Sequence, residues 1–394
     1  MHITEYELYN VPPRWQFVKL TTSDGRVGWG ETHIKWQHTN DSEPATTNAV
    51  DQLFEQSLRG ADPSRIEDLW QAMYRGSFHR GGPVHMSAVS GLDQALWDLK
   101  GKRYGAPIYD LLGGAARDRV KCYQRVRTHR ADADDDIEAS VEDALAQVER
   151  GFDALKMNPA PVLDRIDTPE KVQFSVDLVG AVREAIGPDI DLALDFHGRT
   201  TKAMARELAH AAEPHDPMFI EEPVTPEHND ALARIARSTN VPIATGERMY
   251  TRWDFKPVLE ADAVDVVRPD LSSAGGITEG TKIADMAETY DASFAPHCLT
   301  GPIAFMASIH VDVAAPNTLV QEQSFFRTNH GQDYVQNDGV FDLVDGYIEA
   351  PDGPGLGLEI DKDVIEQREG RDLECAREPV RRSDGSVGEK YSRI

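Results

Sequence analysis

The sequence has few cysteines and no long apolar run. Its three cysteines, Cys122, Cys298 and Cys375, are odd in number and far apart along 394 residues. This spacing argues against a disulfide framework and favours a reducing cytoplasm. No apolar stretch reaches the roughly 18 residues that a membrane span needs, so we expect no span. Residues 1–10 hold neither a basic nor an apolar region, so we also expect no secretory signal.

Positive charge is scarce as well. The chain carries 67 acidic and 41 basic residues, which gives a net charge of -26 and an isoelectric point near 4.8. Nucleic acids and anionic membranes bind basic surfaces, so this balance argues against both as partners. Lysine supplies 12 of the 41 basic residues. Acidic, lysine-poor proteins are typical of salt-loving organisms, where salt screens the self-repulsion; an ordinary acidic cytosolic protein is the alternative.

What is present is the composition of a folded protein. Hydrophobic residues make up 40% of the chain and charged residues 27%, which argues against wholesale disorder. Residues 17–30 alternate like strands around a turn at residues 22–25, which predicts a hairpin. Residues 45–113 carry apolar side chains at helical spacing, as in Ile66, Leu69 and Met73. The N-terminal part is therefore predicted to be a small α+β unit.

A different rhythm follows. Short apolar runs alternate with helical patterns such as residues 170–186 and 202–212, which predicts parallel βα units. Eight such runs match the strand number of a closed (β/α)8-type barrel. An open doubly wound sheet is the alternative, but no G-x-G-x-x-G follows the first strand. The runs are residues 120–126, 154–157, 190–194, 218–220, 242–244, 263–267, 292–295 and 318–320.

The sequence thus predicts an α/β protein with a barrel, in the (β/α)7β form, and an α+β capping domain. We expect the capping domain over residues 1–116 and the barrel over residues 117–328. The remaining segment, residues 329–394, is rich in loops, with a Gly- and Pro-rich stretch at residues 351–357. We expect this segment to pack back on the capping domain.

Polar residues stand at the ends of these runs with a regular beat. From Asp195 onward they are separated by 23 to 27 residues, which is about one βα unit each. In such barrels, catalytic groups come from the carboxyl ends of several strands, so we expect one shared site. Its members are Lys156, Asp195, Glu221, Glu247, Asp270, His297 and Glu322.

Three of these residues predict a metal site. Asp195, Glu221 and Glu247 end neighbouring strands, and three converging carboxylates without a cationic partner would repel one another. A hard divalent cation resolves that repulsion, and an all-oxygen set suits Mg²⁺. The alternative is that one carboxylate pairs with Arg199 or Arg248. Glu222 should point to the other side of its strand and is read as structural.

Two histidines are candidates for proton transfer. His297 ends one strand and Asp270 ends the strand before it. A carboxylate beside an imidazole fixes its tautomer and raises its basicity, which suits a general base. His197 lies two residues after Asp195, so it can face the same pocket. Either histidine could instead be a structural residue, but the neighbouring site favours catalysis for both.

At this point the chain resembles the enolase superfamily, in its mandelate racemase-like branch, and within it the galactonate dehydratase family of sugar-acid dehydratases. The resemblance spans nearly the whole chain; Asp-Phe-His-Gly-Arg and Ala-Pro-His-Cys are its most specific motifs. The matching segments are Pro12–Trp15, Phe78–Pro83, Asp195–Arg199, Phe219–Val224, Thr245–Arg248, Arg268–Leu271, Ala274–Glu279, Ala295–Cys298 and Gln321–Gln323.

The resemblance implies that a base removes the C2 proton of a sugar acid while Mg²⁺ stabilises the enediolate. A general acid then helps the C3 hydroxyl to leave, and a 2-keto-3-deoxy acid results. By the match, His297 is the base with Asp270 behind it, and His197 is the acid. Glu322 would stabilise the intermediate or hold the substrate carboxylate. The residues expected to contact substrate are Lys156, Asn158, Arg248 and, in the cap, Arg14, Trp15 and His79.

Two departures bear on the reaction. Racemases of this branch place Lys-x-Lys at the second strand, where this chain has Lys156-Met157-Asn158. Asn158 cannot abstract a proton, so the segment favours elimination over racemisation. Residues 125–130 replace an expected Gly-rich segment, and residues 159–162 also differ from the family pattern. These differences leave D-galactonate, D-gluconate and D-xylonate as candidate substrates.

Other readings stay open at this point. An epimerase or a cycloisomerase could use the same scaffold, because a fold alone does not fix a function. A non-catalytic sugar-acid binder is a further alternative, although the complete set of ligands, base and acid argues against it. We expect the protein to form a homo-oligomer.

Overall fold

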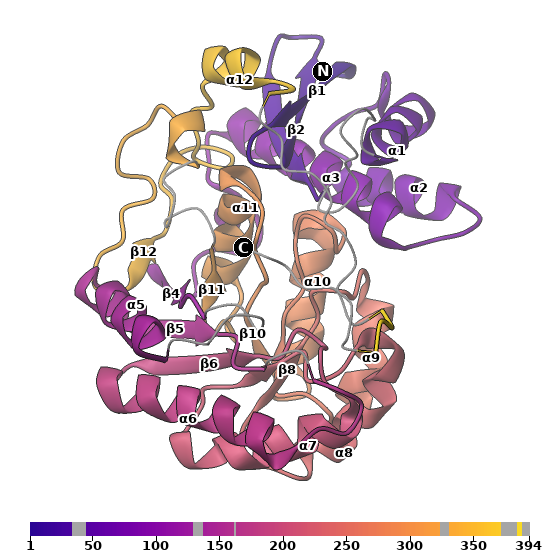
Figure 1. Cartoon of the computed structure of the whole chain (residues 1–394). Helices are drawn as coiled ribbons and strands as arrows, with labels where there is room; N and C mark the ends of the chain where they lie inside the picture. Colours follow the sequence, from indigo (N-terminus) through magenta and orange to yellow (C-terminus); the bar gives the residue numbers. More distant parts are fainter. Residues whose placement is uncertain (34–44, 129–136, 161–162, 324–330, 372–383, 388–394) are drawn as a thin grey trace.

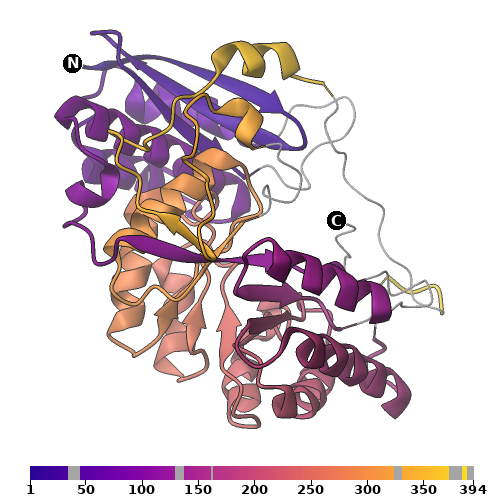
Figure 2. The same cartoon turned by 90° about the vertical axis from the view of Figure 1, so that its left-hand side faces the viewer.

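The computed structural model describes the chain apart from residues 34–44, 129–136, 161–162, 324–330, 372–383 and 388–394. An N-terminal sheet with its helices lies against one side of a larger barrel (Figure 1). Figure 2 shows the same two parts after a quarter turn, with the N-terminal sheet again above the barrel.

The N-terminal part is the predicted α+β cap. Its sheet is antiparallel in the order β1-β2-β3, and β2 and β3 form the expected hairpin. A π-helical turn, Phe54–Leu58, continues the first helix. The elements are β1 (Ile3–Val11), β2 (Trp15–Thr22), β3 (Val27–Thr32), α1 (Ala45–Leu53), α2 (Ile66–Gly76), α3 (Pro83–Tyr104) and α4 (Ile108–Leu111).

Strand β3 packs directly onto helix α3. A Cβ atom at Gly28 or Gly30 would collide with a backbone carbonyl oxygen of that helix, from Ala95 or Gly91 respectively. The absence of side chains at these glycines is therefore what allows the close approach. Helix α3 is buried on nearly all sides, which explains why its apolar residues follow no single stripe.

The barrel contains all eight predicted parallel strands. They are hydrogen-bonded in the order β10-β9-β8-β7-β6-β5-β4-β11. A bridge between Phe294 of β10 and Thr318, just before β11, joins the two edges and closes the ring. The strands are β4 (Arg119–Arg125), β5 (Ala154–Met157), β6 (Asp191–Asp195), β7 (Ile220–Glu221), β8 (Ile243–Thr245), β9 (Val266–Val267), β10 (Ser293–Phe294) and β11 (Gln321–Glu322).

One layer of side chains fills the barrel interior. Each of the eight strands, or the residue next to it, supplies one member, and the layer forms a cluster separate from the main core. Such filling is typical of a closed barrel, whose interior is packed and not a pore. The members are Tyr123, Ala154, Ala193, Phe219, Ala244, Val266, Ala295 and Val320.

Helices cover the outside of the barrel. None of the helices that the structure describes is both long and apolar enough to cross a membrane. The barrel helices are α5 (Ile137–Glu149), α6 (Pro169–Ile186), α7 (Lys202–Ala212), α8 (Leu232–Ala236), α9 (Arg252–Glu260), α10 (Gly276–Glu288) and α11 (Pro302–Ala314), and short 3-10 turns span Glu213–His215 and Pro226–Ala231.

The C-terminal segment contacts both parts. Tyr334, in a 3-10 turn (Gln332–Tyr334), packs its ring edge-on against Trp15 and Phe17 of the cap. Strand β12 (Tyr347–Glu349) instead pairs antiparallel with β4 of the barrel, and α12 (Lys362–Arg368) lies near β1. The segment therefore packs on the cap as expected, and on the barrel as well. The proposed boundary at residues 328 and 329 lies outside the described residues.

The cap is hydrogen-bonded to the loop that follows β9 and to the first turn of α10. Indole N–H groups of Trp70 and Trp97 donate to Gly275 O and Thr278 Oγ1, both at 2.8 Å. The side-chain amide of Gln94 donates to Leu271 O at 2.9 Å. Because this loop begins at Asp270, contacts from α2 and α3 hold the backbone next to a predicted site residue.

Candidate active site

Most of the residues predicted for the site gather at the carboxyl ends of the barrel strands. Lys156 lies in β5, while Asp195, Glu221 and Glu322 end β6, β7 and β11. All four are at most 1% exposed. Asp195 and Glu221 are direct ladder partners, so their side chains start about 5 Å apart.

Two buried cations hold these carboxylates together. Lys156 Nζ lies 2.7 Å from Glu221 Oε2, 2.9 Å from Glu322 Oε1 and 3.6 Å from Asp195 Oδ2. Arg268 joins the same pair, with Nε 2.6 Å from Glu221 Oε1 and Nη2 2.8 Å from Glu322 Oε2. The premise that Asp195, Glu221 and Glu247 lack a cationic partner is therefore wrong for the first two, because the barrel brings Lys156 from β5 and Arg268 from the residue after β9 to them.

The cations and carboxylates of this cluster stabilise each other's charged forms. Burial alone would lower the pKa of the Lys156 ammonium, but Glu221 and Glu322 raise it well above its ordinary value. Burial raises the pKa of Glu221, against the opposing effect of Arg268. Burial would also raise the pKa of Glu322, but the surrounding cations, Lys156 first, hold it below its ordinary range. Asp195, Glu221 and Glu322 thus share two cations, Lys156 and Arg268.

His297 lies between two carboxylates. Its Nδ1 is 2.7 Å from Asp270 Oδ2, and its Nε2 is 2.9 Å from Glu247 Oε2. Burial alone would lower the pKa of His297, but the nearby carboxylates, first Glu322 and then Glu247, raise it to about 10. In this arrangement the ring is an imidazolium, with Asp270 behind it as the sequence predicts.

Asp270 is itself held in place. The backbone N–H of Ser272 donates to Asp270 Oδ1 at 2.8 Å, and the Ser272 hydroxyl donates to the same oxygen. His33 of the cap places its Nδ1 3.7 Å from Asp270 Oδ2. These contacts orient the carboxylate that orients His297.

His197 stands on the opposite wall from His297. It follows β6, which is four strands away from β10 in the ring of eight. Its Nε2 is 2.7 Å from Asp195 Oδ2, and its Nδ1 lies 2.6 Å from Asn158 Nδ2. Burial lowers the pKa of His197 to about 4, although Asp195 opposes the shift. His197 is thus a neutral imidazole at neutral pH.

Glu222 and Arg248 form a pair beside the site. Glu222 adopts a φ of 45°, which turns its side chain away from the strand. Its Oε1 accepts from Thr245 Oγ1 at 2.5 Å and from Gly246 N at 3.0 Å, and Arg248 Nε donates to Oε2 at 2.9 Å. These contacts occupy both carboxylate oxygens of Glu222, and its structural role stays a prediction. Arg248 forms its ion pair with Glu222 and also interacts electrostatically with Glu247 and Asp195, while its contact with substrate stays a prediction.

The three cap residues are placed differently from one another. Trp15 is 3% exposed and packs against Phe17, Tyr334 and the backbone at Gly301, four residues after His297. Arg14 lies next to it in the turn before β2, while His79 is exposed and packs edge-on against Phe78. Trp15 thus supports the loop that follows β10. Substrate contacts from all three stay predictions.

Two family models match this chain. The N-terminal domain of mandelate racemase and muconate lactonizing enzyme matches residues 13–113, and the enolase C-terminal domain-like model matches residues 139–364. The chain belongs to the mandelate racemase and muconate lactonizing enzyme family of the enolase superfamily. The first match falls on the cap from residue 13, and the second falls on the barrel from residue 139.

Relatives within this family cover the whole chain. Proteins named D-galactonate dehydratase from Ralstonia pickettii (strain 12J) and Cronobacter sakazakii (strain ATCC BAA-894) are each 46% identical, over 99% of this chain and 100% of their own. A crystal structure of a mandelate racemase/muconate lactonizing enzyme-like protein from Rubrobacter xylanophilus DSM 9941 is 33% identical with a TM-score of 0.87, over 95% of this chain and 99% of its own. One from Roseovarius sp. TM1035 is 32% identical with a TM-score of 0.86, over 96% and 98%.

The oxygen atoms of the three predicted metal ligands suit a hard divalent cation. Asp195, Glu221 and Glu247 offer oxygen alone from three successive strands. Asp195 Oδ2 makes no well-aligned hydrogen bond, despite its short distance to His197. Within the described ranges, no three His, Cys, Asp or Glu side chains lie in a metal-binding arrangement. Lys156 contacts an oxygen of Glu221, and His297 contacts an oxygen of Glu247. A divalent cation fits the donor chemistry and would compete with both.

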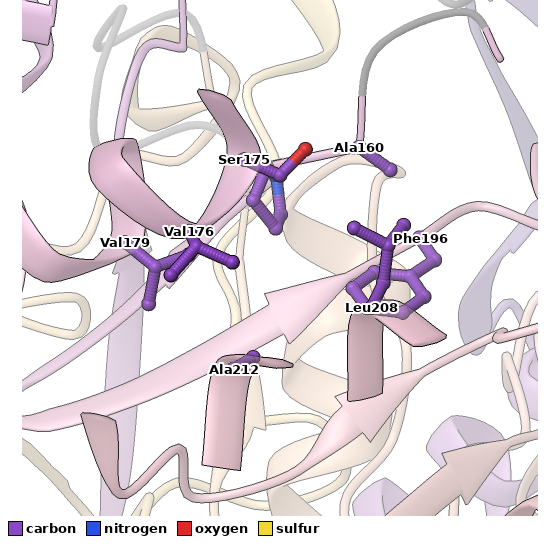
Figure 3. A pocket seen from close by; sticks show the side chains of 8 residues that line it. Ala160, Ser175, Val176, Val179, Phe196, Leu208 and Ala212 are labelled. Atoms are coloured by element: carbon purple, nitrogen blue, oxygen red, sulfur yellow. The ribbon is translucent and has the colours of Figure 1, made fainter. Parts of the chain in front are cut away.

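A small cavity lies on the other side of β6. It has room for roughly one water, about 10 Å³, and lies between α6 and α7. Phe196 contributes to its lining, together with apolar side chains such as Val179 and Leu208 (Figure 3). Because Phe196 points outward, Asp195, which precedes it at the end of β6, points to the opposite face, toward the site. The cavity is therefore part of the helix packing and not a substrate pocket.

Sequence reasoning missed several members of this cluster. Arg268 and Tyr123 are fully buried in it, with Arg268 Nη2 donating to the Tyr123 hydroxyl at 2.7 Å. Arg125 ends β4 and donates from Nη2 to Asn158 Oδ1 at 3.1 Å. The sequence does contain a signal for Arg268, because it directly follows the apolar run 263–267. A charged arginine that is buried at a strand end needs anionic partners.

Proposed function

We propose that this protein is a sugar-acid dehydratase that takes water from C2 and C3 of an aldonic acid, with D-galactonate as its first candidate substrate. The observation that carries the proposal is the pair of imidazoles, His297 and His197, on opposite walls of one carboxylate-lined site. Elimination needs a base at C2 and an acid at C3, and two separate proton-transfer groups supply both.

The steps are assigned to residues as follows. His297 Nε2 takes the C2 proton, and the electron pair moves onto the substrate carboxylate as an enediolate. The enediolate then collapses, the C3–O bond breaks, and His197 gives its Nε2 proton to the departing hydroxide, which leaves as water. The resulting enol loses the proton of its C2 hydroxyl, takes a proton at C3 and so becomes the 2-keto-3-deoxy acid. A neutral imidazole can serve as such an electrophile, since it still carries one N–H.

The base must first lose its own proton. Glu247 and Glu322 keep His297 as an imidazolium in this arrangement, so it acts as a base once that negative charge is neutralised. Mg²⁺ held by Asp195, Glu221 and Glu247 would supply the positive charge that neutralises these carboxylates. It would also act as a Lewis acid toward the substrate carboxylate. Lys156 and Arg268 keep Glu322 ionised and oriented beside the reacting carbons.

Other members of the same reaction class are alternatives. D-gluconate and D-xylonate differ from D-galactonate in hydroxyl configuration or chain length. Residues at the edge of the site would have to distinguish the three acids by these differences. Racemisation is disfavoured because Asn158 stands where a second base would be needed. The complete set of base, acid and carboxylates disfavours a plain binder.

A panel of aldonic acids tests the proposal. We expect a 2-keto-3-deoxy product from at least one member in the presence of Mg²⁺, and none after treatment with a chelator. Glu221→Gln removes one anionic oxygen donor and should weaken Mg²⁺ binding in a calorimetric titration. Full activity in chelator-treated protein would rule out the metal, and no product from the whole panel would rule out the dehydratase.

We further propose that the protein is halophilic and cytoplasmic. A net charge of -26 repels itself at low ionic strength. The Debye length falls from about 30 Å at 0.01 M salt to about 3 Å at 1 M, so molar salt removes most of that repulsion. We expect the melting temperature and the activity to rise between about 0.1 M and about 2 M KCl. A flat melting series would contradict the halophilic proposal and leave the dehydratase proposal untouched.

A further inference from the structure

Glu31 is a carboxylate of the cap that is buried against the barrel. It lies in β3, is 0% exposed, and faces helix α11, which together with α10 lies against the cap (Figure 1). Its Oε1 accepts from Gly301 N at 2.5 Å, and its Oε2 accepts from Ala304 N at 3.0 Å. Both donors belong to the start of α11, so the cap supplies the group that satisfies the N-terminus of a barrel helix.

The chain between His297 and α11 is short. Gly301 follows His297 by four residues, so the carboxylate anchors the loop that begins at the predicted base. The fit is close, because a Cβ atom at Gly301 would lie 2.7 Å from the Trp15 ring and 2.9 Å from Glu31 Oε1. On the barrel side, His297 N donates to Pro269 O at 3.2 Å. His297 is therefore held between a barrel contact at its own backbone and a cap contact four residues later.

The backbone of Glu31 is bonded toward the partner of His297. Glu31 N donates to Gln94 Oε1 at 2.9 Å, and Gln94 Nε2 donates to Leu271 O at 2.9 Å. Leu271 directly follows Asp270, whose carboxylate is hydrogen-bonded to His297. Glu31 thus bridges the loops of both members of this pair, with its backbone toward the loop of Asp270 and its side chain toward the loop of His297.

Both oxygens of Glu31 act as acceptors in this arrangement. Burial raises the pKa of Glu31 to about 8, although the backbone N–H groups that it accepts from, Ala304 first, oppose the shift. An uncharged amide of the same shape should therefore fold at this position. It offers one acceptor oxygen where the carboxyl group of Glu31 offers two, so it can satisfy one of the two N–H groups.

We propose that Glu31 is a positioning residue for the base: by anchoring the start of α11 and, through Gln94, the loop after β9, it fixes where His297 stands relative to the substrate C2 atom. This inference rests on the proposed function, in which His297 takes the C2 proton. It gives the cap a role in the chemistry in addition to the substrate contacts expected of it.

Glu31→Gln and Glu31→Leu, which remove one and both acceptor oxygens, test the proposal. Because a misplacement of about 1 Å can cost about a hundredfold in rate, we expect kcat for dehydration to fall about tenfold in Glu31→Gln and about a hundredfold in Glu31→Leu, with KM within about twofold of wild type. Exchange of the substrate C2 proton should fall by the same factors, because both reactions need His297. A residue that only stabilised the fold would leave both rates unchanged in folded protein.

Asp93→Asn is the matched control. Asp93 is also a fully buried carboxylate of the cap, and it accepts from Thr278 N at 3.0 Å in the first turn of α10. Thr278 lies eight residues beyond Asp270, and Ser90 and Gln94 hold the loop between them separately. We therefore expect kcat within about twofold of wild type. If Asp93→Asn lost as much activity as Glu31→Gln, the cause would be a general weakening of the contact between cap and barrel, and the proposal would be wrong.

Amide hydrogen exchange tests the anchor without substrate. The bonds to Glu31 should protect the Gly301 and Ala304 amides, so the peptide over residues 297–305 should exchange faster in Glu31→Leu than in wild type or Asp93→Asn. Equal exchange in Glu31→Leu and wild type, or a wild-type kcat in folded Glu31→Leu, would overturn this inference; if Glu31→Leu does not fold, the same two measurements on Glu31→Gln decide. Wild type that makes no keto acid would instead overturn the proposed function, and the exchange of the peptide would still show whether Glu31 anchors the loop.

Discussion

Replacing His297 by asparagine should abolish both dehydration and exchange of the substrate C2 proton with solvent. His297 is 3% exposed, its Nδ1 is fixed by Asp270, and its Nε2 faces the carboxylate cluster. Asparagine keeps a polar side chain there but cannot accept a proton from carbon. Because a positioned general base contributes about 10²- to 10⁴-fold, we expect both rates to fall by about a thousandfold. Dehydration is followed as 2-keto-3-deoxy acid, and exchange as deuterium in recovered substrate.

The matching change on the opposite wall should separate the two reactions. His197→Asn should lose dehydration by about a hundredfold and keep C2 exchange, because the acid is needed after the enediolate has formed. His210→Asn is the control, since His210 is exposed on α7 far from the cluster and should change neither rate. Equal exchange in His297→Asn and His197→Asn would show that the two roles are assigned wrongly.

The sequence predicts the barrel well because its signal is local. Each strand is a short apolar run followed by a polar residue. From Asp195 onward these polar residues are 23 to 27 residues apart, and this spacing does not depend on the cap. The strand limits lie within three residues of the predicted runs: the run 154–157 is unchanged, whereas the run 218–220 becomes Ile220–Glu221. At β6, β7 and β11 the strand extends to the polar site residue, which a search for apolar residues leaves out.

The sequence predicts the pairing of Asp270 with His297 for the same reason, because adjacent parallel strands place their carboxyl ends side by side. What it cannot supply is the pairing of residues across the ring. Lys156 and Arg268 meet the same carboxylates from strands β5 and β9, which no spacing along the chain reveals. Arg125 is a similar case, because its contact with Asn158 crosses between strands.

Replacing Arg268 by methionine should cost the protein a large part of its stability. Arg268 is fully buried and donates to Glu221, Glu322 and the hydroxyl of Tyr123. Methionine has a similar length and no charge, so two buried carboxylates would be left to share Lys156. Breaking a buried ion pair on one side typically costs about 3–5 kcal/mol, and we expect a loss of about 3 kcal/mol or more in the free energy of unfolding.

Urea denaturation at neutral pH, with chelator present and at fixed salt, measures this loss without adding ions. Arg206→Met is the matched control, because Arg206 is exposed on α7 and an exposed substitution should change the free energy of unfolding by about 0.5 kcal/mol at most. If Arg268→Met were as stable as wild type, the buried cation would not be what holds the two carboxylates in place.

The pH dependence of the loss shows whether charge is its cause. In wild type, Lys156, His297 and Arg268 hold the pKa of Glu322 below its ordinary value, so the ionised form is favoured by folding. That stability is present above the unfolded pKa of about 4.5 and is lost as the pH falls below it. In Arg268→Met, burial acts with one cation fewer, so the pKa of Glu322 rises and the folded variant binds a proton more readily. The gap between wild type and variant should therefore narrow from pH 8 toward pH 5, whereas a cavity or packing defect would leave it constant.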